Sequence, residues 1–228
     1  MKITVKKSVF KKYSKLKIAF VFVEGINNSM KLEESKHLLK ETEQLIGFTF
    51  NKDTAKTHLL ISPWKTAQEE FGKEAKHYQT SVERLIKAVI KGKTTATGNV
   101  VGNLSRYLAL KHIVPFGVDN FDKIKGDLNF DLATGREKVG VLRNLKKGAL
   151  YYKDEKRILG TKLDYWKSKK TVLDKKSKSA LIHFEILPPV NGKKLGELLK
   201  ETKDLVKTFC NGKVSSFVLD ENNKVKKI

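Results

Sequence analysis

One stretch of the chain combines cations and aromatic rings in a spacing that suits a single-stranded nucleic acid. From residue 162 to 178 the sequence reads KLDYWKSKKTVLDKKSK, with seven lysines and two aromatic residues against two aspartates. Bases stack on aromatic rings while ammonium groups neutralise phosphates. The alternative is a solvated lysine loop whose Trp166 packs into the core. The candidate RNA-binding residues in this basic loop are Lys162, Tyr165, Trp166, Lys167, Lys169 and Lys170.

The whole chain is strongly basic. It carries 47 lysines and arginines against 25 aspartates and glutamates, a formal net charge of +22 over 228 residues. A polyanion is therefore the first partner to consider, with a general lysine excess as the alternative explanation. Lysine is a mobile point charge without the planar fork of arginine, so the composition favours contact with a nucleic-acid backbone over base reading.

Other chemistries lack their motifs. The sequence contains no GxGxxG, P-loop, HExxH or GxSxG pattern, and its five histidines share no metal-ligand spacing. The single cysteine, Cys210, excludes an intramolecular disulfide and is expected to act as a small hydrophobe. We expect no metal and no cofactor. A cytoplasmic location is expected, because the apolar run IAFVFV is too short for a signal peptide and no stretch approaches the roughly 20 apolar residues of a membrane helix.

Helices dominate the expected elements of the first half. The β-branched and aromatic run KIAFVFVEGI (17–26) predicts a buried strand, and a helix follows over about 31–45. A helix from Ser62 is expected to continue through TAQEEF to Gly72, and Thr80 with Glu83 has capping-box spacing for another. After a linker-like stretch (91–99), VGNLSRYLALKH predicts a helix that ends before Pro115.

Strands dominate the second half. The hairpin turn 154–156 separates two of them, and the last helix should begin after Asn191, carry one apolar stripe and close at Asn211. The tail ENNKVKKI is expected to fray. This order predicts an α+β fold with a mainly antiparallel sheet. The expected strands are DLNFDLA, KVGVLR, ALYYKD, RILGTK, ALIHFEIL and VSSFVLD.

The segment 99–133, NVVGNLSRYLALKHIVPFGVDNFDKIKGDLNFDLA, resembles the B3/B4 domain, the editing module of the phenylalanine-tRNA synthetase β subunit. In that family a helix and a proline-containing turn precede an aspartate, an Ile-x-Gly segment and a strand. The resemblance continues more loosely through ALYYKD and WKSKKT to LIHFEIL, and the first ninety residues resemble the extension of free-standing members. The matching positions are Pro115, Asp122, Ile124, Gly126 and Ala133.

The resemblance implies a barrel-like B3/B4 core flanked by helices, with an N-terminal α/β extension. It implies residues 1–95 as a strand–helix extension packed on the core and 96–228 as the B3/B4-like domain, one continuous domain being the alternative. Synthetase members hydrolyse tyrosine wrongly attached to the phenylalanine tRNA. The expected partner is therefore a tRNA acceptor end rather than DNA or a membrane.

Three positions depart from the family's pocket. Gly117 matches its histidine, Ser168 its glutamate, and Arg106 a helix asparagine. Losing an imidazole and a carboxylate removes acid–base groups, each typically worth 10² to 10⁴ in rate. Gly117 would enlarge the pocket or let backbone amides approach the substrate. Arg106 would meet the substrate's carbonyl oxygen or a terminal phosphate, or be an exposed helix residue.

The remaining candidates are polar residues near this pocket. Asn99 and Asn103 either bind polar groups of an amino acid or cap the helix, and capping is the better prediction for Asn99. Ser168 and Thr171 are candidates to orient a water. Catalytic residues are not assigned. The sequence leaves open a trans-acting editing hydrolase of mischarged aminoacyl-tRNA, a non-catalytic RNA-binding module, and an amino-acid-binding protein.

Overall fold

The apolar run near the N-terminus forms a central strand, β2 (Lys17–Glu24), of a four-stranded antiparallel sheet. Its neighbours are β10 (Lys213–Leu219) and β9 (Ser179–Ile186), and β3 (Phe116–Asn120) completes the order β10–β2–β9–β3. Both faces of β2 are buried, because alternate side chains enter two separate apolar cores. The computed structural model describes residues 1–69, 71–73, 78–139, 143–163 and 165–228.

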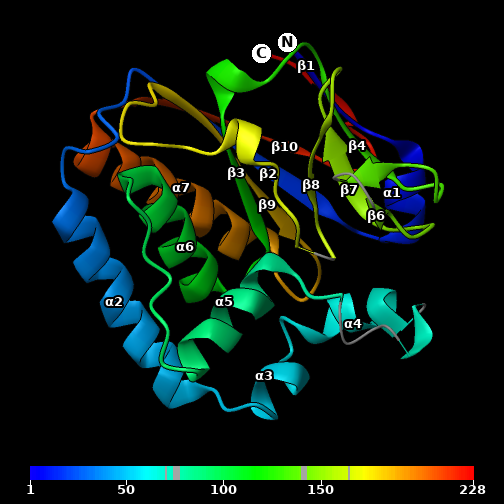
Figure 1. Cartoon of the computed structure of the whole chain (residues 1–228), viewed down its shortest axis with the longest axis horizontal. Coiled ribbons are helices and arrows are strands. Elements are labelled where there is room, and N and C mark those ends of the chain that lie inside the picture. Colours follow the sequence, from blue (N-terminus) through cyan, green and yellow to red (C-terminus); the bar gives the residue numbers. More distant parts are fainter. Residues whose placement is uncertain (70, 74–77, 140–142, 164) are drawn as a thin grey trace.

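Helices cover one face of this sheet (Figure 1). Helices α6 (Val100–His112) and α7 (Gly192–Cys210) contact its strands, α5 (Ser81–Ile90) contacts β3, and α2 (Leu32–Thr49) packs on α6 and α5. Their apolar side chains join Ala19, Val21 and Val23 of β2 in one core. Helix α6 is buried along most of its length, so it is a fixed support for residues on its first turns.

A five-stranded sheet lies on the other face. Its order is β11 (Val225–Lys227), β1 (Lys2–Val5), β4 (Leu128–Leu132), β7 (Leu150–Lys153) and β8 (Ile158–Thr161), with a parallel β1–β4 pair and antiparallel pairs elsewhere. Phe20 of β2 and Phe130 of β4 meet edge to face between the sheets, with ring centroids 5.5 Å apart. The helical layer, the four-stranded sheet and the five-stranded sheet thus lie in succession (Figure 1).

The α+β class is confirmed, whereas a closed barrel is not found. Within the described residues neither sheet closes on itself, because β11, β8, β10 and β3 each pair on one side only. The shorter elements are α1 (Lys7–Lys12), α3 (Thr54–Thr57), α4 (Ser62–Glu69), the hairpin β5 (Lys138–Val139) with β6 (Arg143–Asn144), and 3-10 turns at Phe121–Lys123 and Lys169–Thr171.

Local capping signals predicted several elements correctly. The capping box forms at α5, where Glu83 accepts from the Thr80 backbone N–H at 2.8 Å and donates its own N–H to the Thr80 hydroxyl at 3.4 Å. Asn191 caps α7 and Asn211 ends it in the left-handed conformation. The expected continuation to Gly72 crosses residue 70, and KVGVLR crosses 140–142, which lie outside the described residues.

One prediction is wrong because of long-range strand pairing, and three elements were not predicted from the periodicity of the sequence. The C-terminal tail does not fray, because Val225–Lys227 form β11 and pair with β1. Neither β1 nor α1 nor β3 had been expected. Strands β1 and β2 belong to sheets otherwise built from residues after 96, and the domain boundary at residue 95 stays a prediction. Among the described residues, no helix is long and apolar enough to cross a membrane.

Candidate functional site

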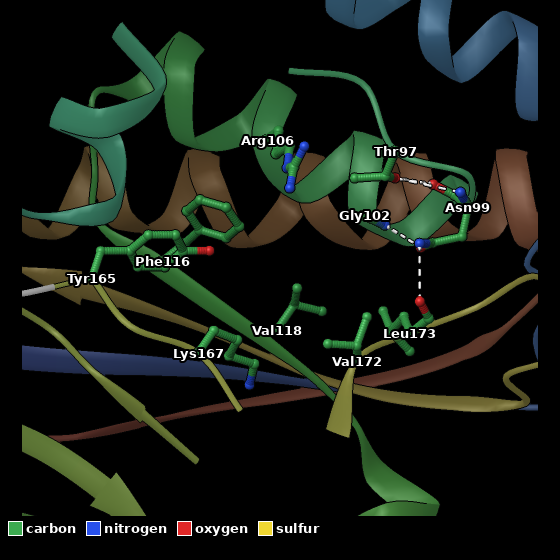
Figure 2. Close-up of a pocket in the computed structure, with 10 residues that line it drawn as sticks. All are labelled: Thr97, Asn99, Gly102, Arg106, Phe116, Val118, Tyr165, Lys167, Val172 and Leu173. Carbon is green, nitrogen blue, oxygen red and sulfur yellow. Dashed lines mark hydrogen bonds between the residues drawn. The ribbon is translucent and has the colours of Figure 1, made fainter. Parts of the chain in front are cut away.

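A cavity of about 110 Å³ lies between the first turns of α6, strand β3 and the basic loop. Figure 2 shows side chains from these three segments facing a common space. The exposed Val172, with 47% of its surface accessible, stands at the rim. The cavity therefore joins the two regions that the sequence had singled out. Its lining residues are Thr97, Asn99, Gly102, Arg106, Phe116, Val118, Tyr165, Lys167, Val172 and Leu173.

Asn99 closes one end of the cavity. Its side-chain oxygen accepts the Gly102 N–H at 2.8 Å, so the expected helix cap is confirmed. Its amide nitrogen donates to the Leu173 carbonyl at 3.4 Å, which ties the basic loop to the start of α6. A Cβ at Gly102 would lie 2.6 Å from the Thr97 hydroxyl and 2.9 Å from the Asn99 oxygen, so this close approach requires glycine.

Asn103 is fully buried and does not line the cavity. Its oxygen accepts the Thr97 N–H at 2.6 Å and the Thr97 hydroxyl at 2.8 Å, while its amide nitrogen donates to the Ser35 hydroxyl at 2.9 Å. These bonds hold residues 95–97 against α6 and α2. Asn103 therefore supports the wall of the cavity from behind.

Arg106 projects from α6 toward the cavity, so it is not the exposed helix residue of the alternative interpretation (Figure 2). Its guanidinium donates to the Thr95 carbonyl. Burial lowers the pKa of Arg106, and the nearby Tyr165 and Glu43 oppose that shift. The Glu43 carboxylate already accepts the Thr95 N–H and hydroxyl, each at 2.6 Å. Because arginine stays charged in proteins, the cavity holds a cation on its α6 side.

Lys167 lines the opposite wall, but its ammonium points away from Arg106 (Figure 2). It forms an ion pair with the buried Asp119 of β3 and donates to the Tyr152 hydroxyl at 2.7 Å. Burial lowers the pKa of Lys167 and Asp119 opposes the shift. The Thr171 hydroxyl donates to the same aspartate. Lys167 and Thr171 thus anchor the basic loop on β3, and the aliphatic part of Lys167 faces the cavity.

Gly117 lies on the other side of β3, facing the five-stranded sheet rather than the cavity. It pairs with His183 of β9, and a Cβ added to it would lie 2.3 Å from the His183 Nε2 atom. The space gained by this glycine is therefore occupied by an imidazole ring. The expectation that Gly117 enlarges the pocket is wrong, because a residue from the neighbouring strand fills the position.

His183 belongs to a buried charged cluster that sequence reasoning missed. Its Nδ1 atom lies 2.6 Å from one Glu185 oxygen, and Lys162 lies 2.9 Å from the other. Burial, with help from Lys162, lowers the pKa of His183. Burial alone would raise the pKa of Glu185, but Lys162 and His183 outweigh it and lower that pKa. Two titratable residues, two positions apart in the apolar strand ALIHFEIL, were the available signal.

Lys162 is only 2% exposed and also donates to the Phe116 carbonyl at 3.1 Å. Its ammonium does not reach the surface that an RNA would contact, which corrects its interpretation as a surface residue. Trp166 is partly buried against the core between the sheets. Ser168 caps the 3-10 turn by accepting the Lys170 N–H at 3.2 Å, and it is buried. Of the predicted RNA-binding lysines, Lys169 and Lys170 are the exposed ones.

The described residues contain no group of three or more histidine, cysteine or acidic side chains placed to hold a metal ion. Cys210 is fully buried, as expected for a small hydrophobe, and burial raises the pKa of its thiol to about 12.

Comparisons with known proteins leave the family unassigned. No family model matches the chain, and no curated protein matches it. One similar solved structure is an N-terminal fragment of the phenylalanyl-tRNA synthetase β-subunit from Pyrococcus horikoshii, with 13% sequence identity and a TM-score of 0.43. The likeness covers 93% of this chain and 50% of that fragment, so the chain spans half the fragment's length. This likeness is too distant to assign a function.

Proposed function

We propose that the chain binds the single-stranded acceptor end of a tRNA and receives its terminal aminoacyl group in the cavity between α6 and the basic loop. One observation carries this proposal: Arg106 of α6 and Tyr165 of the basic loop, far apart in the sequence, line the same cavity. The resemblance of segment 99–133 to an editing module and the net charge of +22 support the same partner.

The outer part of the basic loop would contact the RNA backbone. Lys169 and Lys170 are exposed on the short turn that follows Lys167, which lines the cavity. Lysine ammonium groups at this position suit phosphate contact without base recognition. Binding should therefore weaken steeply as salt rises, since each phosphate contact with single-stranded nucleic acid contributes about −0.7 to the slope of log K against log salt.

The finer proposal is hydrolysis of mischarged aminoacyl-tRNA in trans. Among the described residues, no carboxylate and no imidazole lines the cavity. A water attacking the ester would have to be activated by the terminal ribose hydroxyl of the substrate itself. Because no described residue of the lining supplies a carboxylate or imidazole for acid–base catalysis, slow hydrolysis is expected.

The same absence favours a second candidate, an RNA-binding module without chemistry. Both candidates require acceptor-end binding and differ only in release of the amino acid. An amino-acid-binding protein is the outcome left if free amino acids bind and RNA does not.

Binding is tested with an acceptor minihelix that carries a single-stranded end and with the same duplex made blunt. We expect preference for the single-stranded end and a salt slope that becomes shallower by about 1 to 1.5 in a Lys169→Glu/Lys170→Glu variant. The matched control is Lys226→Glu/Lys227→Glu, since these two exposed lysines lie on β11 and give the same change in net charge. Equal slopes for the two variants would contradict the proposal.

Hydrolysis is tested with a panel of mischarged tRNAs. Release of amino acid above the buffer rate, dependent on Arg106, supports editing. Tight binding with no release from any member supports the non-catalytic module.

A further inference from the structure

Most polar groups around the cavity already have protein partners. The Thr97 hydroxyl bonds to Asn103 and to the Asn99 carbonyl. The Asn99 side chain is used by Gly102 and Leu173, and the Lys167 ammonium by Asp119 and Tyr152. A ligand in the cavity must therefore be recognised by the groups that remain.

Two such groups remain, Arg106 from α6 and Tyr165 from the basic loop. Arg106 has five N–H donors. In the part of the chain that the structure describes, one acceptor, the Thr95 carbonyl, is found for them. The Tyr165 hydroxyl extends into the space beside Phe116 (Figure 2). Among the described residues, this hydroxyl has no side-chain hydrogen-bond partner. Burial raises the pKa of Tyr165 and the charge of Arg106 opposes that shift, so the two groups interact electrostatically. A guanidinium fork and a hydroxyl that line the same cavity provide donors that suit a carboxylate.

Among the described residues, the lining of the cavity offers no acidic partner for a cationic ligand. An ammonium group inside would face Arg106 without a counter-ion from these residues. The Glu43 carboxylate acts on Arg106 electrostatically, but it accepts from Thr94 and Thr95 and does not line the cavity. An α-ammonium group would therefore stay outside the rim.

The rest of the lining is apolar and the volume is small. Val118, Leu173 and Phe116 contribute an aliphatic and aromatic wall, and Val172 stands at the opening. A cavity of about 150 Å³ holds benzene, so about 110 Å³ suits a group of roughly four or five heavy atoms and not a nucleobase. A carboxylate on a stem of one or two methylene groups has this size.

We propose that the cavity selects a carboxylate on a short apolar stem, which in the proposed function is the side chain of an aspartyl or glutamyl ester at the acceptor end. Arg106 and the Tyr165 hydroxyl bind the carboxylate, and the apolar wall holds the stem. The identification of the ester depends on the proposed function, whereas selection of the carboxylate does not.

The carboxylate is tested first without RNA. Butyrate and butyramide have nearly the same shape and differ in charge, and their terminal methyl group takes the place of the α carbon at the rim. Each is titrated into the full chain and followed by amide chemical shifts of residues around the cavity. We expect butyrate to bind at least tenfold more tightly than butyramide. An Arg106→Gln variant should lose this preference, Arg106→Lys should keep part of it, and Tyr165→Phe should reduce it while leaving the ring in place.

The matched control is Arg84→Gln. Arg84 is an exposed arginine that acts on Tyr165 electrostatically but does not line the cavity. If Arg84→Gln lowers butyrate affinity as much as Arg106→Gln does, the effect is general charge and the inference is overturned. Equal affinity for butyrate and butyramide overturns it as well. If Arg106→Gln does not fold, Tyr165→Phe and Arg106→Lys carry the same comparison.

A second experiment separates this inference from the proposed function. Glutamyl and glutaminyl esters of one tRNA are compared for binding, and we expect at least a tenfold preference for the glutamyl ester. Butyrate selectivity without any acceptor-end binding refutes the proposed function and keeps the carboxylate site. Acceptor-end binding with equal affinity for the two esters keeps the function and refutes the carboxylate site.

Discussion

Replacing Gly117 by alanine tests the contact that most clearly departs from the sequence-based expectation. The added Cβ would lie 2.3 Å from the Nε2 atom and 2.4 Å from the Cε1 atom of His183. The imidazole has no room to move away, because its ring meets Phe130 and Tyr152 edge to face and its Nδ1 atom is bonded to Glu185. The new methyl group must therefore displace the packed His183 ring or the backbone of β3.

The loss of stability in Gly117→Ala comes from overpacking alone. Gly117 has no positive φ, so alanine brings no backbone strain at this position. Forcing an extra methyl group into a packed core typically costs about 1 to 3 kcal/mol. For a chain of this size each kcal/mol lowers the melting temperature by about 2 to 4 °C, so we expect a decrease of about 2 to 12 °C.

Thermal unfolding is measured for Gly117→Ala and for a matched control, Gly196→Ala. Gly196 lies within α7, is exposed, and has nothing within 4 Å of an added Cβ, so its replacement should raise the stability by up to about 1 kcal/mol. In a His183→Ala background the clash is gone, and Gly117→Ala should become nearly neutral. A wild-type melting temperature for Gly117→Ala, or the same cost in both backgrounds, would refute the reasoning.

Three further outcomes follow from the buried groups. Burial holds the pKa of His183 below its ordinary 6.5, so the unfolded chain binds a proton at higher pH than the folded chain does. The free energy of unfolding should therefore fall as pH drops below 6.5, by up to about 1.4 kcal/mol per pH unit. Urea unfolding between pH 8 and 5 should show a shallower dependence of this free energy on pH for His183→Asn than for the wild type. Lys162→Met leaves the Glu185 carboxylate buried without its ammonium partner and should lower the free energy of unfolding in urea by about 3 to 5 kcal/mol. Lys2→Met, at an exposed ion pair, should lower it by less than about 1 kcal/mol, and equal losses would contradict the buried pair. The Cys210 thiol, with its pKa raised to about 12, should react with a disulfide reagent at pH 8 only after unfolding, and rapid reaction of the native chain would show that it is accessible.

Prediction from the sequence succeeded where the signal was local. The Thr80–Glu83 capping box, the Asn99 cap and the start of α7 at Asn191 each involve residues within three positions of one another, so the chain needs no distant partner to form them. The apolar run of β2 likewise predicted a strand buried on both faces, because alternate positions were all apolar.

The sequence singled out α6 and the basic loop, and of the six predicted pocket residues Asn99 and Arg106 line the cavity between them. The basic loop and α6 do meet at one cavity. Lysines in that loop look alike in sequence, yet Lys162 is buried with Glu185, Lys167 is paired with Asp119, and Lys170 is exposed. Which lysine enters the interior depends on a carboxylate from another strand, and periodicity does not supply that partner.

Helix caps and apolar alternation depend on residues that are close in the sequence, and net charge depends on composition alone. These features of the sequence determined the class of fold and the kind of partner to consider. Tertiary structure decided which side chains face one another and which face the cavity. It placed His183 over Gly117, paired the tail residues 225–227 with β1, and left Arg106 and Tyr165 as the donors that face the cavity. These outcomes depend on pairing between strands and on packing between layers, where the stabilising partner comes from a distant part of the chain.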